Sequence, residues 1–306
     1  MAKFRVYNIQ LLPVSADVEE VGVRGYKKLF SEFRDHNKAV IRERREGTYH
    51  FRQSEDTFIG PTKNFKFPAG CVYGEFVRYR KTDAVNELGT GKRLFTAGAR
   101  TGVTSEEYFA FVFDTQEHLL AIEAPAWMPA PQVFGDALAG MLQPIADEHF
   151  PQHELGVHSI SKATELEKVF QAANSYSVVD LDLTFRNGHD TEELLRELKE
   201  TRTKSLTVRA SAGKGGRMSR LPEFLKGMLV ATAAGLGSAT ITYFTKQKVG
   251  EKIVERQAKY DSRDMPVTFQ VNRTSAATED PTEFYDRVHD KLLKVGDELD
   301  EEIENG

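Results

Sequence analysis

A basic, glycine-rich stretch, TVRASAGKGGRMSR at 207–220, contains the residue types that hold phosphate groups. It places Arg209, Lys214, Arg217 and Arg220 around three glycines, with no acidic residue among them. Successive backbone amides of a glycine turn can form an anion-binding nest, and nearby cations add favourable charge. The spacing fits neither GxxxxGK[ST] nor GxGxxG, which disfavours a nucleotide site. The stretch therefore predicts contacts with nucleic-acid phosphates, or else a plain solvated turn.

The basic character extends to both sides of this loop. Residues 196–259 contain 14 lysine and arginine residues against 5 acidic ones, whereas residues 274–306 contain 3 against 11. Lys246, Lys248 and Lys252 fall on a hairpin expected further along the basic segment. Such polarity can steer DNA or RNA toward one side of a protein. The alternative is a solvated basic face that the acidic tail of the same chain neutralises.

Two carboxylates, Asp180 and Asp182, alternate with apolar residues in one expected strand and so share a face. Carboxylates at this spacing suit divalent metal binding in nucleases and polymerases. The second interpretation is that they face solvent or pair with Arg209 on the neighbouring strand. A metal-dependent nuclease that uses these two residues is therefore an alternative hypothesis.

Histidine and cysteine form no complete metal or catalytic motif. His149, His153 and His158 lie near acidic residues, but Pro151 breaks a helix between the first two. Cys71 is the only cysteine, which excludes an internal disulfide framework and a multi-cysteine zinc site. We predict no metal site and no cofactor, and we favour a binding protein over an enzyme.

Aromatic and basic residues alternate in two segments of the first half, TKNFKFPAG and EFVRYRK. Stacking rings beside a cationic track are typical of single-stranded nucleic acid binding. Core aromatics flanked by surface charges give the same pattern, and we favour this second interpretation.

The elements that must position these residues indicate an α+β fold. Residues 1–150 are expected to form one domain with a strand at 4–12, a helix bearing Tyr26, Leu29, Phe30 and Phe33, an antiparallel meander and a closing helix after APAWMPAP. The meander is expected over 48–59, 71–80, 92–97, 107–114 and 117–123.

The second half is expected to begin with a hinge and short helix over 151–175, followed by a basic domain over 176–275. The order of its elements predicts a split α/β sandwich, with helices on one face of a sheet. Its expected helices cover 189–200 and 221–234, and its strands cover 176–185, 205–210, 239–244, 252–257 and 266–272. Residues 276–306 are predicted to form an amphipathic helix with an acidic tail, docked through Phe284, Val288, Leu292, Val295 and Leu299.

Composition places the chain among ordinary globular proteins. It has 306 residues, of which 40% are hydrophobic and 28% charged, and its formal net charge is −5. The start, MAKFRVYNIQLLP, lacks the features of a secretory signal, so we predict a cytoplasmic protein. The uncharged run 227–245 is rich in Gly, Ala, Thr and Ser, so we interpret it as a buried helix followed by a strand and predict no membrane span.

The segments FRVYNIQLLP and VGVRGYKKLF, together with YGEFVRYRK and FVFDTQEHLLAIE, resemble an uncharacterised bacterial family of unknown function. The order of the two halves is similar to that of RexA-type and KwaB-type phage-defence proteins. The second resemblance implies DNA contact and phage sensing, although fold analogy assigns no residue a role.

Together these observations predict a sequence-independent nucleic-acid-binding protein, an accessory or sensor component of bacterial anti-phage defence. Its partner would be the DNA or RNA backbone, with a homodimer or a second defence protein as further partners. The alternative functions are the nuclease described above and a protein-binding sensor or inhibitor that contacts no nucleic acid.

Overall fold

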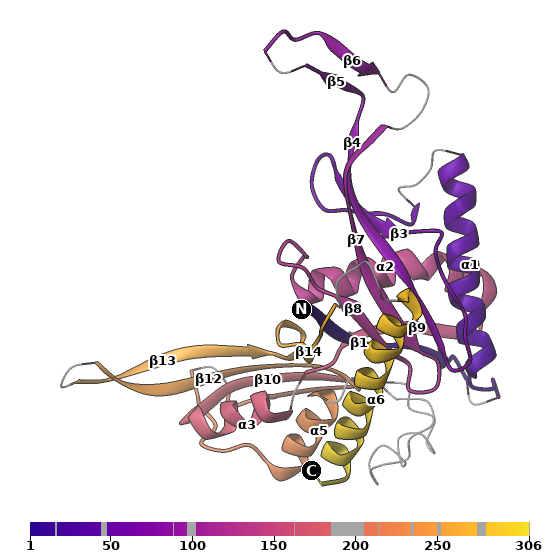
Figure 1. Ribbon diagram of the computed structural model, residues 1–306. Helices are drawn as coiled ribbons and strands as arrows, with labels where there is room; N and C mark the ends of the chain where they lie inside the picture. The colour runs from indigo at the N-terminus through magenta and orange to yellow at the C-terminus, as the bar shows by residue number, and fades with distance from the viewer. Residues whose placement is uncertain are drawn as a thin grey trace.

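Two antiparallel sheets, one of eight strands and one of four, organise the chain, and a short β5–β6 pair stands apart from both (Figure 1). The α+β class predicted from the sequence is thus confirmed. The computed structural model describes residues 1–15, 17–43, 48–87, 89–96, 102–161, 163–184, 205–213, 215–233, 236–249, 252–273 and 280–305. The helix expected at 189–200 lies outside these ranges.

The eight-stranded sheet is built around β1. Its strands, in chain order, are β1 (Ala2–Pro13), β2 (Phe51–Arg52), β3 (Thr57–Pro61), β4 (Cys71–Thr82), β7 (Gly102–Asp114), β8 (Leu119–Glu123), β9 (His153–Ser159) and β14 (Thr268–Val271). The spatial order is β14-β1-β8-β7-β4-β3-β2, and β9 pairs with the later residues of β1. The short pair consists of β5 (Ala84–Asn86) and β6 (Arg93–Thr96). The strands expected at 107–114 and 117–123 are confirmed as the antiparallel pair β7 and β8.

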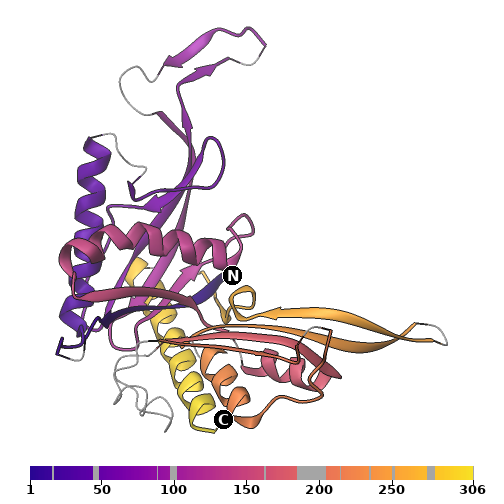
Figure 2. The same ribbon diagram turned by 180° about the vertical axis from the view of Figure 1, so that it is seen from behind.

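Helices cover both faces of this sheet (Figures 1 and 2). One face packs against α1 (Val23–Arg42) and α2 (Pro131–His149), and the other against α6 (Pro281–Asn305). The strand β7 shows why both faces need a cover. Phe109, Phe111 and Phe113 belong to the core under α1 and α2, whereas Ala110 and Val112 belong to the core under α6. Continuous apolar runs of this kind are typical of strands buried on both faces.

The position of α6 settles which surface its apolar stripe covers. All five residues predicted to line that stripe are buried, and they pack with Phe4, Val6 and Ala121 of the eight-stranded sheet. Tyr285 stacks on Tyr73 of β4, with ring centroids 4.3 Å apart. The C-terminal helix therefore completes the core of the sheet that the N-terminal strand begins.

Two segments differ from the sequence-based expectations. Residues 153–159, expected in a hinge, form β9 and pair along β1 from Tyr7 to Pro13. Residues 268–271, expected in the basic domain, form β14 and pair with β1 at Ala2–Arg5. The physical reason is the length of β1, because β8 covers only one edge of it and the opposite edge needs hydrogen-bonding partners over twelve residues.

The four-stranded sheet consists of β10 (Ser175–Thr184), β11 (Ser205–Ser211), β12 (Gly237–Val249) and β13 (Lys252–Asp261), in the spatial order β11-β10-β12-β13. Two helices, α3 (Ala163–Ala172) and α5 (Glu223–Ala233), cover one of its faces. Leu181, Val179 and Ile241 lie in its core together with residues of the two helices. No described helix or strand packs on its other face, which we call the open face. The short 3-10 helix η2 (Ser262–Asp264) follows β13.

The uncharged run 227–245 divides between α5 and β12, as predicted. Gly237 begins β12 with φ of +136°, where a Cβ would lie 1.9 Å from the backbone oxygen of Asp182. Only glycine fits this close approach between β12 and β10. No helix in the described parts of the chain is long and apolar enough to cross a membrane.

Candidate functional site

The three lysines predicted on a hairpin lie on β12 and β13, which extend away from the body of the protein (Figure 1). Pairing of β12 with β10 ends at Phe244, whereas pairing with β13 continues to Val249. Residues 245–249 and 252–256 thus form a two-stranded ribbon, and we use that name for them below. Its exposed cations are Lys246, Lys248, Lys252 and Arg256.

The ribbon carries one acidic side chain among its described residues, Glu255. Arg217 of the glycine-rich loop reaches Glu255 with an N–O distance of 2.6 Å and lies 3.8 Å from the centre of the Phe244 ring. The hydrogen bond from Arg217, with a smaller effect of the Lys246 charge, lowers the pKa of Glu255. Arg217 therefore anchors the loop to the base of the ribbon, and its charge is partly neutralised.

The other predicted phosphate contacts are not gathered at one point. Lys214 lies outside the described residues. Arg220 is exposed but precedes α5, which begins at Glu223, so it does not occupy the first turn of that helix. Arg209 projects from β11 onto the open face and pairs with Asp180 at 3.4 Å.

The carboxylates of Asp180 and Asp182 lie on the open face, as the strand pattern predicts. Asp180 contacts Arg209, as the second interpretation of this pair anticipated, and Asp182 accepts a hydrogen bond from Thr207 at 2.7 Å. Their cross-strand neighbours on β12 are Thr240 and Ser238, neither of which is acidic. Within the described residues the only group of three or more potential metal ligands lies elsewhere, between α1 and α2.

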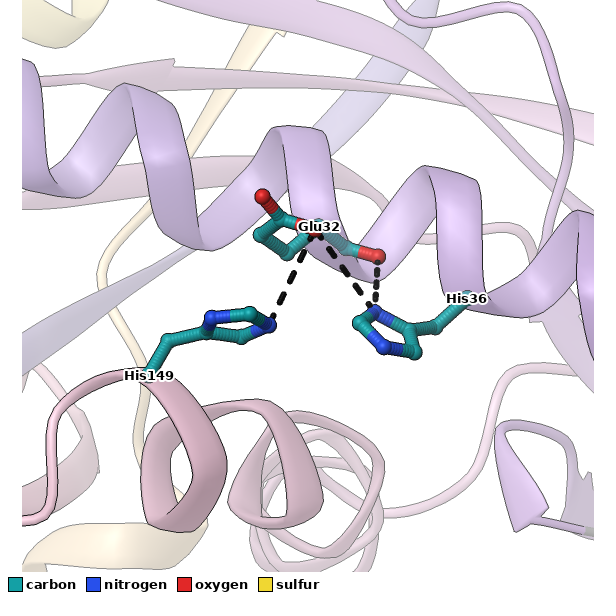
Figure 3. A group of neighbouring side chains, drawn as sticks. All are labelled: Glu32, His36 and His149. Carbon is teal, nitrogen blue, oxygen red and sulfur yellow. Dashed lines mark hydrogen bonds and ion pairs between the residues drawn. The ribbon is translucent and has the colours of Figure 1, made fainter.

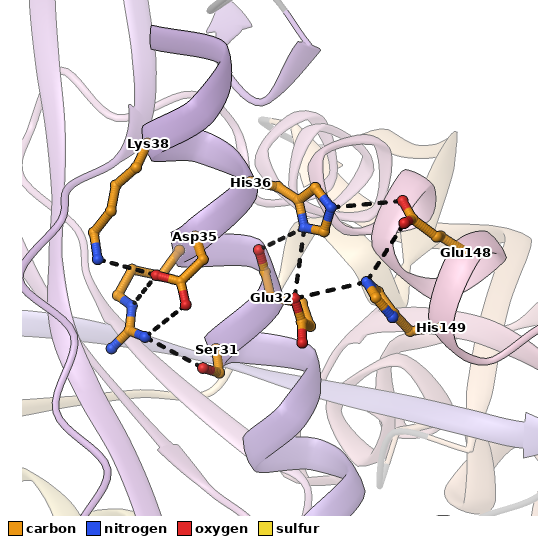
Figure 4. A network of polar contacts seen from close by, with 8 residues as sticks. Ser31, Glu32, Asp35, His36, Lys38, Glu148 and His149 are labelled. Atoms are coloured by element: carbon orange, nitrogen blue, oxygen red, sulfur yellow. Dashed lines mark hydrogen bonds and ion pairs between the residues drawn. The ribbon is translucent and has the colours of Figure 1, made fainter. Parts of the chain in front are cut away.

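That group consists of Glu32, His36 and His149, whose ligand atoms all lie within 4.8 Å of one another (Figure 3). Glu32 and His36 are four residues apart on α1 and so share one face of the helix. His149 is the last residue of α2, and Glu148 precedes it. We call these four residues the His/Glu cluster, and Figure 4 shows how the two helices present them to one another.

The imidazoles and carboxylates of the cluster alternate in space. The His149 Nε2 atom lies 3.7 Å from a Glu32 carboxylate oxygen and 3.9 Å from one of Glu148, while His36 Nε2 lies 3.6 Å from Glu148. The His36 Nδ1 atom is 2.9 Å from the backbone oxygen of Glu32. Because a carbonyl oxygen only accepts, Nδ1 is the donor in this bond.

His153 and His158, the other two histidines considered in the sequence, are not part of the His/Glu cluster. His153 and His158 lie on β9, beyond the end of α2. His153 Nε2 bonds to the backbone oxygen of Glu19 at 2.9 Å, and burial lowers the pKa of His158. Pro151 separates these residues from His149, as the sequence indicates, and the partners of His149 come from α1 instead.

A second polar constellation, a buried relay, lies beside the far end of α1. Asn37 Nδ2 donates to the Pro61 oxygen at 2.9 Å, which leaves its Oδ1 atom to accept from His50 Nε2, also at 2.9 Å. His50 Nδ1 then accepts from the Tyr79 hydroxyl at 2.8 Å. The His50 ring packs directly against the backbone of Gly60, where a Cβ would lie only 2.4 Å from ring atoms, so a residue with a side chain would not fit there.

This relay forms the wall of an open pocket of about 740 Å³ between α1, β3, β4 and β7. The cations Lys38, Arg42 and Lys63 line it as well. Tyr79 is buried, as are Phe65 and Phe76 from the two aromatic and basic segments. The interpretation of these rings as core residues is confirmed.

Replacing Asn37 with alanine should lower the free energy of unfolding by about 2 kcal/mol, because the buried His50 Nε2 and Pro61 oxygen lose the hydrogen bonds that Asn37 provides. Chemical denaturation measures this change. Asn64→Ala, at an exposed position of the same pocket, is the matched control and should stay within about 0.5 kcal/mol of the wild type. Equal effects of both substitutions would contradict the relay.

The arrangement of strands and helices defines an α+β protein with two antiparallel sheets. The family model described as "Domain of unknown function (DUF4747)" matches residues 2–289, and the chain belongs to this family. The predicted resemblance to a family of unknown function is therefore confirmed, and it extends through both sheets into α6. Neither the curated proteins nor the solved structures contain a match to the chain.

Sequence reasoning missed the His/Glu cluster and the buried relay. The spacing of Glu32 and His36 on one helix face was a usable signal, but their partners lie more than a hundred residues away. The relay joins Asn37, His50 and Tyr79 from three separate segments, and no local pattern relates them.

Proposed function

We propose that this protein binds the phosphate backbone of nucleic acids, independently of sequence, through the ribbon of β12 and β13. The observation that carries the proposal is the charge of the ribbon, which presents four exposed cations. In the described residues none of the four has an ion-pair partner, and the neighbouring Glu255 is engaged by Arg217. Uncompensated cations on a projecting element favour a polyanionic partner.

The shape of the ribbon supports the same proposal. Lys246 and Lys248 share the side of the open face, whereas Lys252 and Arg256 lie on the opposite side, as the cross-strand pairing requires. The major groove of B-form DNA is about 12 Å wide and admits a two-stranded β-ribbon. Cations on both faces would then meet the phosphates that border the groove. Closer to the body of the sheet, Lys259 and Arg209 lie on the open face, where each forms an ion pair, with Asp261 and Asp180 respectively.

The experiment is a binding titration with labelled duplexes and single strands of unrelated sequence at several salt concentrations. We expect dissociation constants on the order of micromolar at physiological salt, and affinity that falls steeply as salt rises. Lys246→Gln with Lys248→Gln should weaken binding to every sequence about equally and reduce the salt slope by roughly 1 for each lysine. Neither substitution touches a buried group, so the folded protein should be retained.

The matched control removes two lysines from the helices on the other face of the same sheet. Lys168 of α3 pairs with Glu165, and Lys226 of α5 pairs with Glu223. Lys168→Gln with Lys226→Gln should leave affinity and salt slope close to the wild type. No binding at the lowest salt concentration would refute the proposal, and an equal loss in both double variants would refute the role of the ribbon.

A second candidate function is protein binding, favoured by apolar side chains at the outer ends of the two projecting elements. Leu94 and Phe95 of β6 are 62% and 46% exposed, and Ile253 of the ribbon is 70% exposed. Adjacent exposed apolar residues such as Leu94 and Phe95 mark interaction sites. A protein sensor would keep its partner at high salt, whereas phosphate contacts would be lost there.

An accessory or sensor role in anti-phage defence is the setting that we propose for this binding. This setting rests on the element order expected from the sequence alone, because the matching family model carries no functional description. Protection of cells against phage, compared between the wild type and the Lys246→Gln, Lys248→Gln variant, would link the ribbon to that role.

A further inference from the structure

The geometry points to a binding site for one divalent transition-metal ion in the His/Glu cluster, where it would join α1 to α2. Glu32, His36 and His149 bring one carboxylate and two imidazoles together, and Glu148 supplies a second carboxylate. This inference is independent of nucleic-acid binding, because the cluster lies on the eight-stranded sheet's helical layer and the ribbon belongs to the other sheet.

The distances between the side chains are longer than hydrogen bonds and leave room for a metal ion. Tetrahedral Zn²⁺ holds nitrogen and oxygen ligands at about 2.0–2.2 Å, which places the donor atoms roughly 3.4 Å from one another. Neighbouring donors of the cluster are separated by 3.6–3.9 Å. The ligand atoms of Glu32, His36 and His149 all lie within 4.8 Å of one another, so side-chain movements of at most about 1.4 Å would bring them to the spacing of a tetrahedral site. Direct N–H···O hydrogen bonds would require separations near 2.9 Å.

The hydrogen bonding of the histidines prepares them as ligands. His36 donates from Nδ1 to the Glu32 backbone oxygen, so in the neutral ring the lone pair is on Nε2, which faces Glu148. Metal-bound histidines commonly donate their other ring N–H to a carbonyl in this way, which fixes the tautomer and the ring orientation. His149 Nε2 is shielded from solvent and has no hydrogen-bond partner in the described structure, yet it faces Glu32 and Glu148 (Figures 3 and 4).

The donor set selects the class of metal. Imidazole nitrogen suits Zn²⁺ and the neighbouring first-row ions, whereas Mg²⁺ and Ca²⁺ prefer oxygen ligands alone. The sequence predicts no metal site here, because His149, His153 and His158 do not share a face of one helix or strand. Glu32 and His36 of α1 supply the carboxylate and the second imidazole that lie near His149.

The alternative is an ion-pair cluster in which protonated histidines balance the two glutamates without any metal. The two arrangements differ in their response to metal ions. An ion-pair cluster gains nothing from Zn²⁺, whereas a metal site is stabilised by its ligand in proportion to the logarithm of the metal concentration above the dissociation constant.

The experiment uses the full chain, stripped with a chelator and dialysed, and titrates it with Zn²⁺, Co²⁺ and Mg²⁺ as separate probes. We expect saturable binding of one Zn²⁺ per chain by calorimetry, a rise in melting temperature, and a visible Co²⁺ absorption band of a site with imidazole ligands. Mg²⁺ should produce none of these changes. Each titration is repeated with the variants below.

His36→Gln with His149→Gln should weaken Zn²⁺ binding at least 10-fold and abolish the Co²⁺ band. Glu32→Gln keeps both histidines and should also weaken binding, which provides a second variant if the double substitution does not fold. The matched control is Asp147→Asn with His153→Gln, which removes one acid and one imidazole next to the cluster. Asp147 bonds to Gln143 and His153 to Glu19, and neither contacts the cluster, so binding should stay at the wild-type level.

Two outcomes would overturn the inference. One is the absence of saturable Zn²⁺ or Co²⁺ binding by the wild type. The other is binding that the cluster variants and the control variant reduce to the same extent, since this would place the metal on other surface groups.

Discussion

Replacing Leu292 with alanine should lower the free energy of unfolding by about 2–5 kcal/mol. Leu292 is fully buried where α6 packs on the eight-stranded sheet, together with Val288 and Val6. The substitution removes apolar contacts and leaves a cavity in a layer that the adjacent strands cannot easily fill. Denaturant unfolding monitored by circular dichroism measures the change.

Leu293 provides the control, because it is the next residue on the same helix and is 37% exposed. Leu293→Ala makes the same chemical change on the side of α6 that faces away from the core, and should cost no more than about 0.5 kcal/mol. If the two substitutions cost the same, α6 does not pack on the sheet as the structure has it.

The packing of α6 also concerns the element that carries the ribbon, because this last helix of the chain contacts strands of the N-terminal half. The helix packs on β7 and β8, strands of the N-terminal half, although it follows the basic segment in sequence. The ribbon is therefore carried on a unit that leaves the first sheet after β9 and returns to it at β14. Loosening α6 should destabilise the first sheet while leaving the residues of the ribbon itself unchanged.

The sequence predicted the elements whose pattern is local. The alternation of Val179, Leu181 and Leu183 with Asp180 and Asp182 identifies β10 and its two faces, and the structure agrees. The apolar stripe of α6 was predicted for the same reason, because its residues repeat at helical spacing. In each case the periodicity of one short segment determines which side chains are buried.

The pairing of distant segments was not predictable in this way. The strands β9 and β14 are short, and the sequence of neither one indicates that it pairs with β1. The same limitation applied to the His/Glu cluster, since nothing near Glu32 points to His149. Among the predicted phosphate contacts, Arg217 had a partner, Glu255, that lies 38 residues further along the chain.

Replacing His289 with alanine should lower the free energy of unfolding at neutral pH by about 3 kcal/mol. The His289 Nε2 atom on α6 lies 2.6 Å from the carboxylate of Asp114, whose side chain is only 3% exposed. The backbone amides of Gln116 and Glu117 donate to the other carboxylate oxygen. The variant would leave a buried carboxylate with two of its three donors.

This contact should also make stability depend on pH in the acid range. Burial by itself raises the pKa of Asp114, but the hydrogen bonds from His289 and the two backbone amides outweigh it, and the pKa is lowered. A carboxyl group with a lowered pKa in the folded state stabilises the protein above its unfolded pKa of about 4, and this contribution is lost as the pH falls through the folded value. The wild type should therefore lose more stability than His289→Ala between pH 7 and about pH 3.

His153→Ala is the control, because its ring bonds to a neutral carbonyl, and it should keep the acid sensitivity of the wild type. Parallel profiles of stability against pH for the wild type and His289→Ala would show that His289 does not lower the pKa of Asp114.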